Sequence, residues 1–104
     1  MKRREIRWYK FSPPNKNRPV LILTRDSVLD LLGEVTIAPV TSTIRDIPSE
    51  VFLSRDVDGM PNDCVVNLDH IQTVSKKKIG SVITILSDRR MKEVRAALLF
   101  ALGF

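Results

Sequence analysis

The chain has 104 residues, of which 43% are hydrophobic and 28% are charged, and its formal net charge is +5. This length and composition are typical of a small globular protein, so we expect a single domain over residues 1–104. No apolar run approaches the roughly 20 residues of a membrane-spanning helix and the basic start leads into no secretory signal, which predicts a cytoplasmic protein without a membrane partner.

The first predicted strand covers residues 5–11 (EIRWYKF), which are rich in strand-forming side chains. A loop with two prolines follows at 12–17, and a second strand is predicted at 19–25. Pro19 lacks a backbone donor and therefore suits the first position of a strand, and the aliphatic run after it predicts burial on both faces. Arg18 is thereby placed at the rim of the sheet, where it either has a structural role or holds a chemical group.

The next segment predicts a helical turn at 26–32 and a third strand at 34–43 (EVTIAPVTST). Pro39 interrupts this strand close to its C-terminal end. Because proline cannot donate a hydrogen bond to a neighbouring strand, it predicts an edge strand or a bulge at this point. The side chains of Thr41 and Ser42 would then point in other directions than in a regular strand.

The second half of the chain predicts more short strands and one helix. The strands are expected at residues 50–53, 64–68 and 79–86, with a polar connection at 45–49 and a turn-rich segment at 56–63. No helix or strand is predicted for residues 69–78. Ser87 is a suitable N-cap for a terminal helix, whose apolar stripe is formed by Met91, Val94, Leu98 and Ala101. Together these elements predict a mainly β fold, a small, strongly bent antiparallel sheet or barrel with the helix packed on it.

Basic residues gather near both ends of the chain and in a run of three lysines at 76–78. A basic surface favours a polyanionic partner, because each phosphate contact releases counterions. A solvated face that keeps the protein soluble explains the same charge equally well. Charge alone therefore leaves both interpretations open.

No common catalytic or cofactor motif is present: the sequence lacks a phosphate-binding glycine loop, a CxxC pair, HExxH and G-x-S-x-G. The single histidine, His70, excludes a histidine-based metal cluster. The single cysteine, Cys64, lies in an apolar run and predicts a core thiol. We therefore expect neither a metal nor a cofactor, and the candidates for chemistry are polar side chains at strand ends.

Three segments in order carry a resemblance to a known family. They are RPVLIL at 18–23, VTIAPVTST at 35–43 and DCVVNLDHIQTV at 63–74, followed by a late strand and a terminal helix. With this order and spacing, nearly the whole chain resembles the MazF/PemK family of toxin endoribonucleases, in particular its short mycobacterial members. The resemblance implies an SH3-like barrel of about five to seven strands with a C-terminal helix.

The resemblance also implies a function. Members of this family act as homodimers that cut single-stranded RNA within short sequences, without a metal ion. They leave a 2′,3′-cyclic phosphate and a 5′-hydroxyl, and the cleavage inhibits translation and growth. The implied partners are therefore single-stranded RNA, a second copy of the chain and a cognate MazE-like antitoxin whose flexible tail occupies the RNA groove of a type II toxin–antitoxin system.

By this resemblance, Arg18 matches the family's catalytic arginine, Thr41 matches its catalytic threonine, and Asp69 matches an aspartate implicated in the related Kid toxin. A guanidinium is a fixed cationic fork suited to phosphate oxygens and a poor proton shuttle. We therefore expect Arg18 to stabilise charge electrostatically, with general acid or base action as the alternative. The residues expected to contact RNA are Lys16, Asn17, Ser42, Asp69 and His70.

The sequence departs from the family pattern at two places. The loop before Arg18 is shorter than usual and lacks the common Gly-Ser-Glu segment. His70 replaces the usual glutamine after the aspartate, and Asn67 stands where the Kid toxin has an arginine. An imidazole changes charge near neutral pH, so His70 either takes part in RNA contact or proton transfer or makes a structural hydrogen bond.

Two rival functions stay open on the same fold. The first is a non-enzymatic, CcdB-like toxin that binds and poisons DNA gyrase, although such toxins lack the pairing of arginine and threonine. The second is a basic small-barrel RNA-binding protein without catalysis, which the low aromatic content of 6% makes less favourable.

Overall fold

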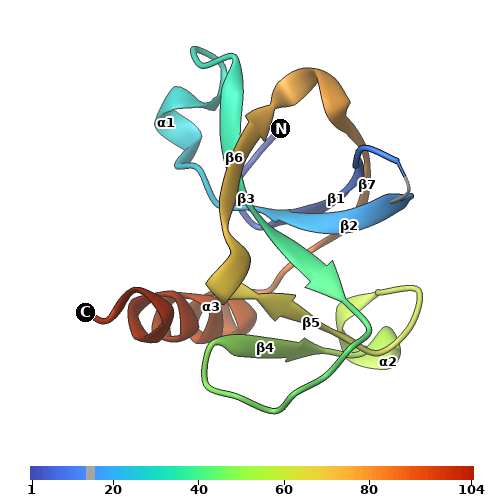
Figure 1. The fold of residues 1–104 in the computed structure, drawn as a ribbon, viewed down its shortest axis with the longest axis vertical. Helices are drawn as coiled ribbons and strands as arrows, with labels where there is room; N and C mark the ends of the chain where they lie inside the picture. The colour runs from blue at the N-terminus through green and yellow to red at the C-terminus, as the bar shows by residue number, and fades with distance from the viewer. Residues whose placement is uncertain (14–15) are drawn as a thin grey trace.

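The computed structural model describes residues 1–13 and 16–104 (Figure 1). Positions 14 and 15 of the predicted proline loop lie outside the described residues. The strands are β1 (Glu5–Lys10), β2 (Asn17–Ile22), β3 (Glu34–Thr41), β4 (Glu50–Leu53), β5 (Cys64–Asn67), β6 (Gln72–Ser75) and β7 (Ile79–Ile85). The helices are α1 (Asp26–Leu29), α2 (Arg55–Asp58) and α3 (Asp88–Leu102), with short 3-10 helices η1 (Leu68–His70) and η2 (Lys76–Lys78).

The strands form a strongly bent antiparallel half-barrel in the order β4-β5-β3-β2-β1-β7, with β6 paired to β3 beside this path. Figure 1 shows β1, β2 and β7 in one half of the molecule, β4 and β5 in the other, and β3 running between them. Helix α3 packs against β4 and η1. The predicted bent sheet with a packed C-terminal helix is therefore confirmed.

Strand β2 is buried on both faces, as its aliphatic run predicts. Successive side chains of a strand point to opposite faces, and each face of β2 lies in a different apolar cluster. Leu21 packs with Ile6 and Leu86, whereas Val20 and Ile22 pack with Val35 and Ile37; all seven side chains are at most 1% exposed. This double burial fixes the strand that carries Arg18.

The bounds of β2 differ from the prediction of 19–25. The strand starts at Asn17 and ends at Ile22, so Arg18 lies inside it. Pairing with Lys10 and Tyr9 of β1 extends the strand toward the N-terminus, over Asn17 and Arg18. Cross-strand pairing of this kind has no signature in the local sequence.

Pro39 lies inside β3, which pairs with strands on both edges, so the predicted edge position is wrong. On one edge Pro39 is opposite Val20 of β2, and the register there runs without a bulge. On the other edge β3 pairs with β6 as far as Ile37 and with β5 from Val40 onward. Pro39 falls between these two partners, where a missing backbone donor costs no ladder hydrogen bond.

Strand β6, helix α2 and the short 3-10 helices η1 and η2 were not predicted. Strand β6 forms within the segment 69–78, for which neither helix nor strand is predicted, and it pairs with β3 from Glu34 to Ile37. Helix α2 occupies the start of the predicted turn segment 56–63. The end of the chain agrees with prediction, because the Ser87 hydroxyl accepts from the Arg90 N–H and caps α3. Among the residues described, no helix is both long and apolar enough to cross a membrane.

Candidate active site

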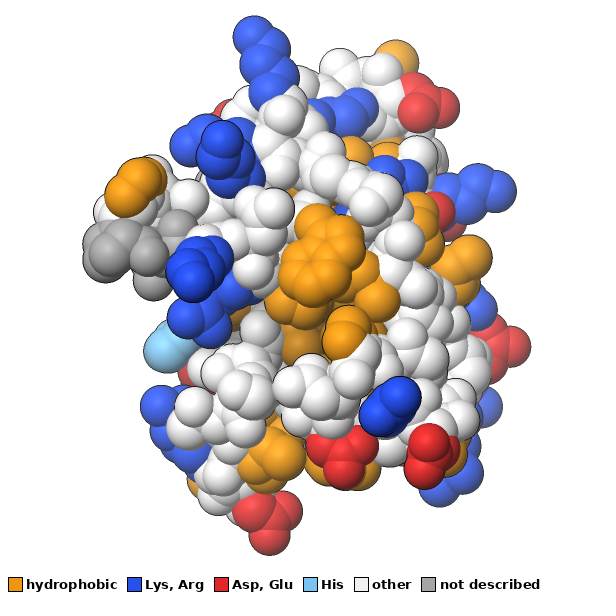
Figure 2. Space-filling model, turned by 90° about the vertical axis from the view of Figure 1, so that its right-hand side faces the viewer, with side chains coloured by type: hydrophobic (Ala, Val, Ile, Leu, Met, Phe, Trp, Pro, Cys, Tyr) orange, Lys and Arg blue, Asp and Glu red, His pale blue; other side chains and the backbone are white. Residues whose placement is uncertain are grey.

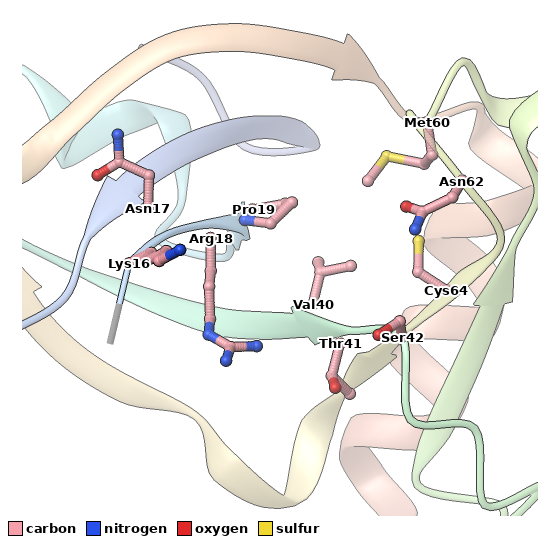
Figure 3. Close-up of a pocket in the computed structure, with 10 residues that line it drawn as sticks. All are labelled: Lys16, Asn17, Arg18, Pro19, Val40, Thr41, Ser42, Met60, Asn62 and Cys64. Carbon is pink, nitrogen blue, oxygen red and sulfur yellow. The ribbon is translucent and has the colours of Figure 1, made fainter. Parts of the chain in front are cut away.

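A cavity of about 420 Å³ opens where the start of β2 lies beside the end of β3 (Figure 3). The two strands are antiparallel, so these ends are neighbours although they are separated by more than twenty residues. The cavity is lined by Lys16, Asn17, Arg18, Pro19, Val40, Thr41, Ser42, Met60, Asn62 and Cys64. Five of the seven predicted site residues thus meet in one place, and the predicted pair Arg18 and Thr41 is among them.

The Arg18 side chain is exposed at the cavity. Figure 3 shows its guanidinium pointing to the same side as the Thr41 hydroxyl. Because the side chain is exposed, its guanidinium is open to solvent on the side of the cavity. The five N–H donors of the guanidinium are therefore available to an anion. The buried strand β2 fixes the position of the Arg18 backbone.

Thr41 is half-buried at the end of β3. Its hydroxyl oxygen accepts a hydrogen bond from the Thr43 N–H at 3.2 Å. Because that bond uses the oxygen as an acceptor, the hydroxyl proton is free to be donated to a ligand. The backbone contact also restrains the side-chain rotamer, so the donor is directed before a ligand arrives.

The charge of the cavity is positive. Lys16 and Arg18 are the charged residues of its lining, and none of the lining residues is acidic. A concave site with one sign of charge attracts ions of the other sign, here an anion such as phosphate. Among the residues described, no three His, Cys, Asp or Glu side chains gather as a metal site would require.

Asp69 and His70 lie outside the lining of this cavity, on η1. The Asp69 carboxylate accepts from the Ser49 hydroxyl, and its N–H donates to the Asn67 side-chain oxygen at 2.9 Å. The Asn67 Nδ2 lies 3.3 Å from His70 Nδ1. Asn67 therefore joins both predicted residues in one hydrogen-bonded group, and their contact with RNA stays a prediction.

Sequence reasoning missed the second wall of the cavity. Met60, Asn62 and Cys64 belong to a segment predicted only as a turn and the start of a strand, and topology brings it opposite β2. No local signal in the sequence identifies this placement. Cys64 is a buried free thiol, as predicted, and it lies at the edge of the cavity as well as in the core.

The Cys64 thiol is expected to be unreactive in the folded protein. Burial raises its pKa from the usual 9.0 to about 11, and the negative charges of Asp58 and Asp63 act in the same direction. At neutral pH the thiolate fraction is then roughly 100-fold smaller than that of a free cysteine. We expect alkylation by iodoacetamide to be slower by about this factor in the native protein than in urea, as followed by mass spectrometry. Equal rates would contradict the buried, neutral thiol.

Comparisons with known proteins point to one family. The model of the PemK-like, MazF-like toxin of type II toxin-antitoxin systems matches residues 2–102. The chain is similar to the probable endoribonuclease MazF2 of Mycobacterium tuberculosis, with 41% identity over 93 residues that cover 89% of each chain. Its fold is similar to that of the Mycobacterium tuberculosis toxin MazF-mt6, with a TM-score of 0.88 and 34% identity over 97% of this chain and 98% of the other. It is also similar to MazE-MazF from Deinococcus radiodurans, with a TM-score of 0.84 and 25% identity over 100% of this chain and 97% of the other.

Proposed function

Because the chain belongs to the PemK-like, MazF-like family of type II toxins, we propose that it is a sequence-specific endoribonuclease that cuts single-stranded RNA. One observation carries the proposal: Arg18 and Thr41 meet in an open, cationic cavity at the ends of two neighbouring strands. The name of its mycobacterial relative, a probable endoribonuclease, supports the same activity. We assign the activity to one toxin domain over residues 1–104.

The proposed reaction uses the RNA's own 2′-hydroxyl as the nucleophile. The 2′-oxygen loses its proton to water and attacks the adjacent phosphorus, and the P–O5′ bond breaks as the 5′-oxygen takes a proton from water. The products are a 2′,3′-cyclic phosphate and a 5′-hydroxyl, and no metal ion takes part. Negative charge grows on the non-bridging phosphate oxygens in the transition state, and this charge needs a positioned donor.

Arg18 supplies that donor in the proposal. A guanidinium offers parallel N–H groups that match two phosphate oxygens, and it stays protonated throughout. Its backbone is held by β2, which is buried on both faces, so little reorganisation is needed when the charge develops. Thr41 donates its hydroxyl proton to a phosphate oxygen or orients the 2′-hydroxyl.

The remaining site residues contact the RNA chain beside the reacting phosphate. Lys16, Asn17 and Ser42 line the same cavity and are all exposed. Asp69 and His70 would contact nucleotides farther along the strand, because they lie on η1 outside the lining. In this proposal, His70 takes no necessary part in proton transfer.

We propose two protein partners: a second copy of the chain and an acidic, MazE-like antitoxin. Figure 2 shows an apolar patch at the centre of one face of the molecule, and a contiguous exposed patch is a common sign of a protein interface. The net charge of +5 complements an acidic antitoxin that competes with RNA. We place the protein in the cytoplasm, where its RNA substrate is found and where a free thiol such as Cys64 stays reduced.

Incubation with mixed RNA in EDTA, followed by mapping of the RNA ends, tests the function. We expect cuts within short sequences, with cyclic phosphate and 5′-hydroxyl ends. A single 2′-deoxy substitution at the cut should abolish cleavage there, because it removes the nucleophile. Absence of cleavage together with gyrase arrest, or with RNA binding alone, would favour one of the two rival functions instead.

A further inference from the structure

The cavity has a second wall that the proposed chemistry does not use. Figure 3 shows Met60, Asn62 and Cys64 on the side opposite Lys16 and Asn17. Met60 and Cys64 are each 3% exposed and present apolar surface, whereas Asn62 is exposed. Because Asn62 is exposed in the lining of the cavity, its amide donor and acceptor are both available there.

The segment that carries Asn62 is fixed at its start by a buried ion pair. The Asp58 carboxylate receives two hydrogen bonds of 3.0 Å from the Arg90 guanidinium of α3 and one of 2.8 Å from the Ser54 N–H. The Thr84 hydroxyl of β7 donates to the Asp58 carbonyl oxygen at 2.8 Å. The C-terminal end of α2 is therefore tied to two other elements of the fold.

The turn after α2 is fixed as well. Gly59 adopts a left-handed conformation with φ of 73°, which ends the helix and directs the chain back toward the core. Met60 then enters the core, and the Asp63 carboxylate accepts from the Arg55 N–H at 3.1 Å before β5 begins. Asn62 thus lies between anchored neighbours, so its backbone is held in one place beside the cavity.

We propose that this wall is a subsite for one nucleobase next to the scissile phosphate, and that the Asn62 amide reads the edge of that base. The inference rests on the proposed endoribonuclease activity. An amide presents a donor and an acceptor side by side, and the bases of single-stranded RNA expose edges with the complementary pattern. The Met60 thioether and the Pro19 ring offer apolar surface for the face of the base. Adenine, with a neighbouring amino group and ring nitrogen, is the base that an asparagine amide matches best.

The test compares Asn62→Ala with a control from the same segment, Asp56→Ala. Asp56 lies exposed on α2 and does not line the cavity. Values of kcat/KM are measured on oligonucleotides that carry each of the four bases at each position beside the cut. We expect Asn62→Ala to cut the preferred substrate roughly 10- to 100-fold more slowly and to lose discrimination at one position only. Asp56→Ala should keep both the rate and the preference, and both variants should melt like the native protein because these side chains are exposed.

A second variant, Asn62→Asp, replaces the donor NH₂ with an acceptor oxygen. At the same position the preference should move toward cytosine, whose amino group a carboxylate accepts. The subsite is refuted if Asn62→Ala keeps its preference at every position, or if it slows all substrates by the same factor. In either case cleavage by the native chain still supports the endoribonuclease. If the native chain cuts no RNA, the proposed function fails and the subsite fails with it.

Discussion

Cleavage of RNA by an Arg18→Ala variant is expected to be roughly 100- to 1000-fold slower than cleavage by the native chain, which is the usual effect of removing one preorganised donor from a developing negative charge. The side chain is exposed, so the fold should be unaffected. Single-turnover rates on a saturating oligonucleotide measure the effect on the chemical step without the contribution of binding. A rate within a few-fold of the native rate would show that Arg18 is not a catalytic residue.

Arg89→Ala is the matched control, because it lowers the net charge of the protein by one unit, as Arg18→Ala does. The Arg89 side chain is 87% exposed on α3 and does not line the cavity. If loss of overall charge were responsible, both variants would slow to the same degree, and added salt would reduce the difference from native. We expect only Arg18→Ala to slow the chemical step. Arg18→Lys should recover part of the rate, since it keeps the charge and loses the two-pronged fork.

A change of the leaving group distinguishes two roles of Arg18, which are general acid catalysis and stabilisation of charge on the phosphate. In a substrate with sulfur in place of the bridging 5′-oxygen, departure no longer needs a proton. If Arg18 acts as the general acid, Arg18→Ala should cut this substrate almost as fast as the native chain does. If Arg18 stabilises charge on the non-bridging oxygens, as we propose, the deficit should persist. The comparison needs no change in pH and so leaves the titration of other groups unaltered.

The parts of the fold that the sequence predicts are those with local causes. The aliphatic run after Pro19 predicts a doubly buried strand, because it is short, begins at a proline and contains β-branched residues. The terminal helix is predicted from its cap at Ser87 and its apolar stripe. Strand β6 and the placement of Pro39 depend instead on which strand lies beside β3, and no local pattern encodes that choice.

The same division applies to the site. Arg18 and Thr41 stand close to prolines near strand ends, and the resemblance to a toxin family is enough to pair them from the sequence alone. The wall that holds Asn62 comes from a turn about twenty residues farther along, and its position depends on the ion pair between Asp58 and Arg90. An acidic residue in a turn and a basic residue on a helix are common in any sequence, so their pairing could not be predicted.

That ion pair should contribute strongly to stability. The side chain of Asp58 is 3% exposed and that of Arg90 is 15% exposed. Asp58→Ala leaves the Arg90 guanidinium desolvated with Glu93 as its remaining partner, at 3.0 Å. Removing one member of a buried pair typically costs about 3–5 kcal/mol, and because Glu93 remains we expect a value near ~3 kcal/mol in urea unfolding at neutral pH.

The contribution of the pair between Asp58 and Arg90 to stability should decrease as the pH is lowered. Burial alone would raise the pKa of Asp58, but hydrogen bonds from Arg90 and from the Ser54 N–H, together with the charge of Arg90, outweigh it and lower the pKa. The folded state therefore binds this proton less tightly than the unfolded state does. The contribution is fully present above the unfolded pKa of about 3.9 and is lost as the pH falls through the lowered native value.

A second ion pair of the same protein supplies the control. Arg4 and Asp88 are 2.7 Å apart, yet their side chains are 43% and 83% exposed. Exposed pairs typically contribute less than about 1 kcal/mol, because water screens the attraction and competes for both groups. Asp88→Ala should therefore cost far less than Asp58→Ala although its contact is shorter. Equal losses would show that burial does not set the strength of the Asp58 pair.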